Sequence, residues 1–182
     1  MKKKVLFMAV MVVGAICFVS CGQRQQGEYE KQIVGKWHGA FSQEDEDGIK
    51  MVMETTTDYR SDKTEVFDGL LRFRVEVNDG DYANNLTFEY SVSGEGTWDV
   101  DGDYFIEKIN KCDIELKKAY ALAEMEDNDL YIGVIKEALE DGIPEIRNSM
   151  MQKSKDKIIK LNDSEFSIKD DEGDTETYTR IE

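Results

Sequence analysis

The side chains that most often serve as nucleophiles, general bases or metal ligands are scarce in this 182-residue sequence, which has one histidine, His38, and three cysteines. A single histidine cannot hold a zinc ion without several cysteine or carboxylate partners, and the sequence has no His-Glu-x-x-His or Cys-x-x-Cys pattern. It also lacks a Gly-x-Ser-x-Gly nucleophile elbow and a glycine-rich phosphate loop ahead of a helix. We therefore expect no enzyme activity, no metal site and no cofactor, and we interpret His38 as a solvated side chain.

Carboxylates are the one abundant reactive group, since Asp and Glu number 39 against 23 Lys and Arg. Two acidic clusters, Asp99–Asp103 and Asp170–Asp174, could be taken for calcium loops, but neither continues in the order that an EF-hand requires. Asp and Gly at these places favour tight hairpin turns, with a metal site as the alternative. Nearly all other carboxylates fall in turns or on outward strand positions, where a pKa is not raised for acid–base work.

The N-terminus has the order of an export signal. Three lysines precede the apolar run Val5–Val19, which is too short for a comfortable membrane span. The run leads into "FVSC", which resembles a bacterial lipobox, in which Cys21 is lipidated and becomes the mature N-terminus. Residues 1–20 are therefore predicted to be a lipoprotein signal peptide, with an ordinary signal or an uncleaved anchor as the alternative. Gly22 follows the cysteine in place of the Asp that resembles an inner-membrane retention signal, which favours the outer membrane and leaves the face open.

The cysteines and the net charge of the chain limit the molecules that it is expected to bind. Cys17 leaves with the signal and Cys21 carries the lipid, so Cys112 is the remaining thiol; we expect it to be a buried apolar side chain, with a reactive thiol as the alternative. The net charge of −16 becomes −19 once the three signal lysines are removed. Such an acidic surface repels nucleic acid and anionic lipid headgroups. Nucleic acid is excluded as a partner, and membrane attachment is expected through the lipid on Cys21.

The rest of the chain has room for one domain, residues 30–182, after a polar tether over residues 21–29. Apolar and polar side chains alternate along four stretches, which is typical of antiparallel strands with one wet face. These stretches are Gly35–Phe41, Ile49–Tyr59, Glu65–Val77 and Leu86–Val100. A fifth strand is expected from Tyr104 to about Leu116, although Asp113–Met125 has strong helical propensity.

A helical insert is predicted over about residues 119–153, before the last three strands. Asp129–Glu140 has helical spacing, Gly142 is expected to end that helix, and Pro144 is expected to start a second one, with an interior kink as the alternative. The apolar stripe of the insert either docks on the barrel or faces a partner; it comprises Leu130, Tyr131, Val134, Ile135, Ala138 and Leu139. Three strands follow, over Lys157–Leu161, Glu165–Lys169 and Thr175–Ile181. The fold class is therefore all-β, an eight-stranded antiparallel up-and-down barrel that closes to remove its edges.

Several motifs together are similar to the lipocalin-like-domain lipoproteins of Bacteroidetes: the lipobox, "IVGKWHG" at residues 33–39, "SGEGTWDVDGD" at residues 93–103, and the terminal "YTRIE". The resemblance implies a lipocalin-type barrel in which Trp37 plugs the closed end. It also implies that Gly35 lets the incoming backbone pass close by and that Arg180 stacks over the tryptophan. All three residues are then structural.

The barrel interior holds either packed side chains or one small ligand. Inward glycines at Gly69, Gly94 and Gly96 would make strand corners or leave volume for a guest. The ligand-binding candidates are Met51, Met53, Phe73, Phe88, Tyr90 and Trp98. The predicted function is a lipid-anchored cell-envelope lipoprotein that binds a small hydrophobic or amphipathic ligand. The alternative is a solid scaffold that binds another envelope protein through its helical insert or its acidic face.

Overall fold

The computed structural model describes residues 27–44, 48–79, 82–121 and 128–181. The predicted signal peptide 1–20, the lipidated Cys21 and the tether as far as residue 26 lie outside the described residues. Residues 27–33 form a short helix ahead of the first strand, and this helix includes residues 27–29 of the expected tether.

Eight antiparallel strands make one ring-like sheet. Each strand pairs with the next along the chain, and the last strand pairs with the first. The strands are β1 (Gly35–Glu44), β2 (Lys50–Tyr59), β3 (Thr64–Asp79), β4 (Tyr82–Asp101), β5 (Tyr104–Ala121), β6 (Lys153–Leu161), β7 (Glu165–Lys169) and β8 (Thr175–Ile181). The prediction of an all-β ring of eight antiparallel strands, with a helix before the last three, is confirmed.

Alternation of apolar and polar residues explains why these segments are strands. Along β4 the buried apolar side chains recur at every second position, and they include Leu86, Phe88, Tyr90, Val92, Trp98 and Val100. Most intervening positions face outward, as Glu95 and Asp99 do, although Thr87 is buried. Burying each large apolar side chain stabilises the fold by about 1.5–3 kcal/mol, so a slip of one residue in register would be costly.

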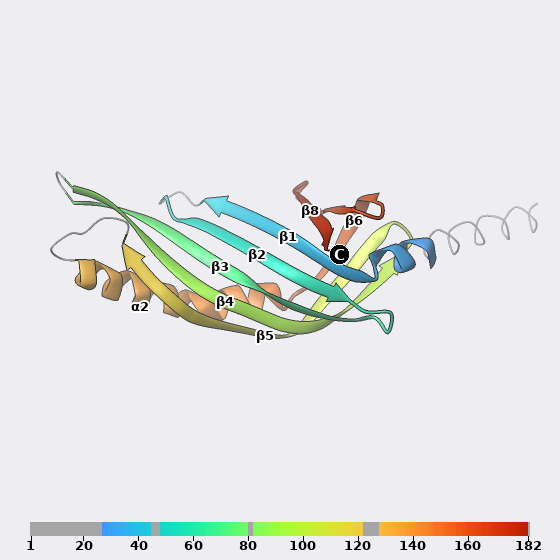
Figure 1. Ribbon diagram of the computed structural model, residues 1–182, viewed down its shortest axis with the longest axis horizontal. Coiled ribbons are helices and arrows are strands. Elements are labelled where there is room, and N and C mark those ends of the chain that lie inside the picture. The colour runs from blue at the N-terminus through green and yellow to red at the C-terminus, as the bar shows by residue number, and fades with distance from the viewer. Residues whose placement is uncertain (1–26, 45–47, 80–81, 122–127, 182) are drawn as a thin grey trace, which may run out of the picture.

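The ring is closed at one end only, because β6, β7 and β8 have nine, five and seven residues, whereas β3, β4 and β5 have 16, 20 and 18. The strand β8 pairs with β1 over Lys36–Gly39, and β6 pairs with β5 over Tyr104–Lys108. Strands β1–β5 extend well beyond this region, and helix α2 (Asn128–Met150) runs alongside their far halves (Figure 1). Helix α2 therefore takes the place of the missing strands at the other end.

Two irregularities in β5 interrupt the alternation of inward and outward side chains along the strand. Its pairing with β4 skips Asn110 and Lys117, which marks two β-bulges. Each bulge reverses which side chains face inward, so the inward set passes from Ile109 to Cys112 and from Leu116 to Ala119. The strand continues to Ala121, so the expected insert of about 119–153 begins too early.

Helix α2 is one continuous helix that passes through Gly142 and Pro144. The expectation that Gly142 ends one helix and Pro144 starts another is wrong, even though Pro144 cannot donate a hydrogen bond to the carbonyl of Glu140. Packing compensates for that loss, since Ile143 is buried against β3 and β4. Part of the predicted stripe faces the sheet, with Tyr131, Ile135 and Leu139 joined by Ile132 and Ile146.

The interior contains three packed layers along the ring axis. Trp37, Trp98, Phe105 and Phe166 fill the closed end, and the α2 side chains cover the opposite end. A smaller cluster around Phe67 and the buried thiol of Cys112 lies between them. In the ranges that the structure describes, no helix is both long and apolar enough to cross a membrane.

Candidate functional site

Gly35, Trp37 and Arg180 meet at the seam between β1 and β8. Trp37 is fully buried and lies opposite Arg180 in the strand register, with the guanidinium carbon 4.2 Å from the centroid of the indole ring. The indole N–H donates a 2.7 Å hydrogen bond to the carbonyl of Ile33, and the ring meets the ring of Phe166 edge-on at 5.8 Å. The stacking contributes about 1–2 kcal/mol when it is partly desolvated.

The Arg180 side chain also ties β8 to two other backbone segments through three carbonyl groups. Its Nη1 donates to the carbonyl of Val34 at 3.0 Å, its Nη2 donates to the carbonyl of Gln32, and its Nε donates to the carbonyl of Asp163 at 2.8 Å. Two of these carbonyls lie at the C-terminal end of the helix over residues 27–33, where a cation is favourable. Gly35 has φ of 135°, and a Cβ there would collide with the guanidinium. The three residues therefore form a structural unit.

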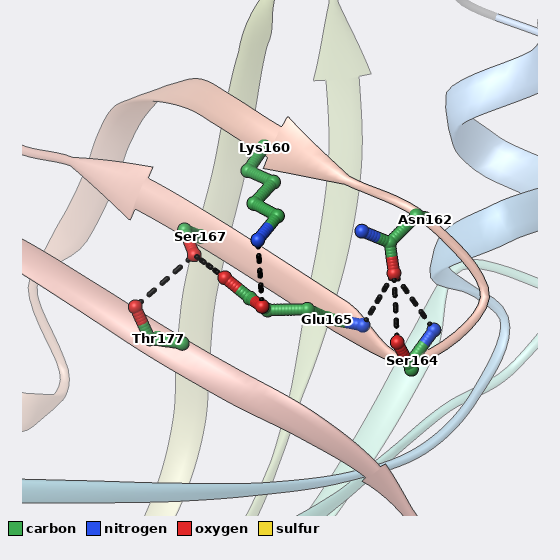
Figure 2. Close-up of polar contacts among 6 residues, drawn as sticks. All are labelled: Lys160, Asn162, Ser164, Glu165, Ser167 and Thr177. Atoms are coloured by element: carbon green, nitrogen blue, oxygen red, sulfur yellow. Dashed lines mark hydrogen bonds and ion pairs between the residues drawn. The ribbon is translucent and has the colours of Figure 1, made fainter.

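The turn between β6 and β7 presents the Asp163 carbonyl to Arg180. The side chain of Asn162 stabilises this turn, as Figure 2 shows. Its Oδ1 accepts hydrogen bonds from the N–H of Ser164 and of Glu165, both at 2.9 Å. The backbone N–H of Arg180 donates to the carbonyl of Ser164 at 3.0 Å. Side-chain contacts continue this network across β6, β7 and β8 through Lys160, Glu165, Ser167 and Thr177.

Beyond this closed end the ring contains unfilled space. A cavity of about 310 Å³ lies between β1, β2, β8 and the second half of α2. Its walls are mainly apolar, formed by Phe41, Met51, Met53, Leu71, Ile146 and Met150. The exposed side chains of Gln43 and Ser149 also border it, so it opens to solvent.

A second cavity, of about 210 Å³, lies closer to the packed end of the ring. It shares Met53, Met150 and Glu176 with the larger cavity, so the two adjoin. Its walls are more polar and carry hydroxyl and carboxyl groups from Thr55, Thr57, Tyr59, Glu107, Glu176 and Tyr178. We call the two together the interior cavity, with an apolar outer part and a polar inner part.

The six predicted ligand-binding residues lie in three different places: the wall of the interior cavity, the core that α2 covers and the core at the closed end. Met51 and Met53 form walls of the interior cavity. Phe73, Phe88 and Tyr90 instead pack in the core that α2 covers. Trp98 belongs to the closed-end core, where its N–H donates to the carbonyls of Arg60 and Thr64, both at 3.1 Å.

The inward glycines make room for neighbouring backbone and side chains and not for a guest. A Cβ at Gly69 would collide with the backbone of β2. A Cβ at Gly94 would collide with the backbone of β5 and the ring of Phe67, and a Cβ at Gly96 would collide with the carboxylate of Glu65. Gly96 therefore allows a carboxylate to lie directly against the strand backbone inside the ring.

Two glutamates from β3 and β5 face the interior. Glu65 is fully buried, and neither of its oxygens meets a hydrogen-bond donor among the residues that the structure describes. Glu107 lines the inner part of the cavity and accepts a 2.9 Å hydrogen bond from the hydroxyl of Tyr59. We call Glu65 and Glu107 the carboxyl pair.

Burial governs the electrostatics of the carboxyl pair. Burial, followed by the nearby charge of Glu107, raises the pKa of Glu65 to about 10. Burial also raises the pKa of Glu107, although the hydrogen bond from the Tyr59 hydroxyl opposes that shift. Two buried carboxyl groups that face one another cannot both ionise easily. The pair therefore keeps one proton at neutral pH.

The two glutamates are exceptions to the expectation that nearly all carboxylates lie in turns or on outward positions. The inward position of both residues could have been predicted from the sequence, because side chains two residues apart on a strand point to the same face. Glu65 lies two residues before the inward Phe67 on β3, and Glu107 lies midway between the inward Phe105 and Ile109 on β5. Strict alternation places both glutamates inside, whereas the general rule that charged residues are exposed places them outside.

The wall opposite the carboxyl pair is also acidic. The hydroxyl of Tyr178 donates to Glu176 Oε2 at 2.5 Å, and burial raises the pKa of Tyr178 well above its ordinary value. Among the described residues, no three His, Cys, Asp or Glu side chains are placed to hold a metal ion. The polar inner part thus offers hydrogen-bond acceptors and negative charge to a bound molecule.

Comparison with known proteins adds no family assignment. The sequence matches no known protein-family model and no curated protein. The observations that bear on the function of the protein are therefore the motifs in its sequence and the interior cavity of the ring.

Proposed function

We propose that this chain is a lipid-anchored cell-envelope lipoprotein whose lipocalin-like barrel binds one small hydrophobic or amphipathic molecule in its interior cavity. The observation that carries the proposal is the cavity itself. Its outer part, of about 310 Å³, is within the range of 300–1,000 Å³ that is typical of small-molecule sites. Flexible methionines on opposite walls, Met53 on β2 and Met150 on α2, suit a guest of irregular shape.

The lipocalin-like part of the proposal is supported by the seam. A tryptophan after a Gly-x pair on the first strand, covered by an arginine of the last strand, is the arrangement that the resemblance implies. The lipid anchor is supported by the order of basic residues, apolar run and "FVSC" at the N-terminus.

The test is to look for a guest that accompanies the protein out of the cell. We expect native mass spectrometry of the protein produced from its full sequence to show an added mass that denaturation removes. Extraction with organic solvent should then release the same molecule. A protein with Met53→Trp, which fills the cavity, should carry much less of it. A mass that always equals that of the lipidated chain alone would argue against the proposal.

One observation favours the alternative, an interaction with another envelope protein. Leu130 and Val134 lie one turn apart on α2 with 64% and 60% of their surface exposed. Replacing both by serine should remove a partner captured by cross-linking in intact cells and leave guest binding unchanged. If no partner is captured, or if it survives this change, α2 is not a partner surface.

A further inference from the structure

Building on the proposed function, we propose that the guest is an amphipathic organic cation, with its ammonium group against the Glu107–Glu65 carboxyl pair and its apolar body under α2.

The buried state of Glu65 is the first reason. It has no exposed surface, and both oxygens are without a donor from the described residues. A buried polar group without a partner is costly, and a buried carboxylate without a counter-charge is more so. A guest that brings N–H donors and a positive charge would supply what the described part of the chain does not.

The surroundings of the pair favour a cation over an anion. The groups that act on Glu107 from other elements are Tyr59 on β2, Glu65 on β3, Asp156 on β6, and Glu176 on β8. Glu176 and Asp156 act on Glu107 through their negative charge, and none of the four groups is a cation, so the local field is negative. An anionic guest such as a fatty acid would meet repulsion there.

The shape of the cavity favours an amphipathic molecule over a bare ion. Glu107 lies on the wall of the inner part, which adjoins the apolar outer part through Met53 and Met150. A charged group that reaches Glu107 from solvent can therefore trail an apolar body along Met51 and Ile146. A metal ion would need more ligands than the described residues supply, because no three acidic, His or Cys side chains converge.

Binding should exchange a proton for the cation. The pKa of Glu65 is raised to about 10 by burial and by Glu107, so the empty pair holds one proton. An ammonium group beside the pair stabilises its doubly ionised form, and the proton leaves to solvent. The net charge inside the cavity then changes little: one ammonium group is bound and one proton is released.

The experiment compares three probes that share an eight-carbon chain and differ in the headgroup: octylammonium, octanol and octanoate. Titration calorimetry at pH 7 on the protein produced from its full sequence should show octylammonium binding at least about tenfold more tightly than octanol, because a hydrogen-bonded charge pair outweighs a neutral contact. Octanoate should bind most weakly. Repeating the titration in buffers of different ionisation enthalpy should show release of up to one proton with octylammonium and none with octanol.

Variants separate the carboxyl pair from the rest of the cavity. Glu107→Gln should lower the affinity for octylammonium about tenfold and leave that for octanol within about twofold. Glu65→Gln should abolish the proton release. Glu76→Gln, on the exposed face of β3, is the matched control and should change neither value. Urea denaturation checks that each variant is folded.

The outcomes distinguish guest binding in the cavity, which is the proposed function, from the preference for a cation. If none of the three probes binds, the proposed function itself fails. If octanol or octanoate binds as tightly as octylammonium, the cavity binds guests but the cation preference is wrong. If the preference for octylammonium survives in both folded variants, the charge is recognised elsewhere and the role of the carboxyl pair is overturned.

Discussion

Trp37 and Arg180 face each other across the seam between β1 and β8, with the guanidinium carbon 4.2 Å from the centroid of the indole ring. This seam joins the first and last strands through four residue pairs, Lys36–Ile181 to Gly39–Tyr178. Few backbone pairs close the ring, so side-chain contacts are expected to stabilise the closed state. The contacts that we expect to matter are those of Arg180 with the helix over residues 27–33 and with the β6–β7 turn.

The two residues should therefore be energetically coupled. Trp37→Ala should lower the free energy of unfolding by about 3–5 kcal/mol, since a fully buried aromatic ring is lost. Arg180→Ala should cost less, through lost stacking and lost hydrogen bonds to backbone carbonyls. Urea denaturation of both single variants and the double variant should give an interaction energy of about 0.5–3 kcal/mol. Additive losses would show that the contact contributes nothing to closure.

Replacement of Gly35 by alanine should destabilise the protein. The φ of 135° is unfavourable for any residue with a Cβ, and that Cβ would displace the Arg180 guanidinium from its carbonyl partners. The matched control is Gly133→Ala in α2, where a Cβ meets open space. The control should raise stability by about 0.5–1 kcal/mol, because alanine favours a helix. Equal effects of the two changes on thermal unfolding would contradict the role of Gly35.

Stability should depend on pH through Glu65. Its pKa is raised from 4.5 to about 10 in the folded state, chiefly by burial. Between these values the folded protein holds a proton that the unfolded chain has released, so the free energy of unfolding falls as the pH rises through this window. Glu65→Gln keeps a neutral side chain in place. It should flatten the dependence by up to about 1.4 kcal/mol per pH unit and should stabilise the protein at pH 8.

Urea denaturation from pH 5 to pH 9 measures this effect. Glu76→Gln removes a carboxylate from the exposed face of the same strand and should leave the slope as it is. A Glu65→Gln protein whose stability varies with pH as the unaltered protein's does would show that Glu65 is ionised in the folded state.

The proposed lipid anchor predicts a simple fractionation result. Cys21→Ala should move the protein from the membrane to the soluble fraction, because the lipid on Cys21 is the attachment that we propose. Labelling with a radioactive fatty acid should mark the unaltered protein and not the variant. If Cys21→Ala stays in the membrane after a salt wash, another feature attaches the protein.

Regular alternation made much of the ring predictable from the sequence. It identified β1–β4 and their inward side chains, and the seam partners Trp37 and Arg180 followed from the resemblance. The end of β5 was not predictable, because the bulges at Asn110 and Lys117 reverse the alternation twice. Tertiary packing of Ile143 carries α2 through Pro144 against the local preference for a break.

The candidate site was less predictable than the fold. Whether Met53 lines a cavity or a packed core depends on how the short strands β6–β8 and helix α2 divide the two ends of the ring, and spacing in the sequence does not contain this information. The carboxyl pair is brought together by the pairing of β3, β4 and β5, in which Gly96 leaves room for Glu65.

The most direct test of the account is binding of a neutral apolar probe, N-phenyl-1-naphthylamine, followed by its fluorescence. The unaltered protein should bind it saturably at one site. Met53→Trp and Ser149→Trp, from opposite walls of the cavity, should each abolish binding, whereas Ile159→Trp, on the half-exposed outer face of β6, should not. Absence of saturable binding to the unaltered protein, or equal binding to all four folded proteins, would contradict a ligand-binding cavity inside the ring.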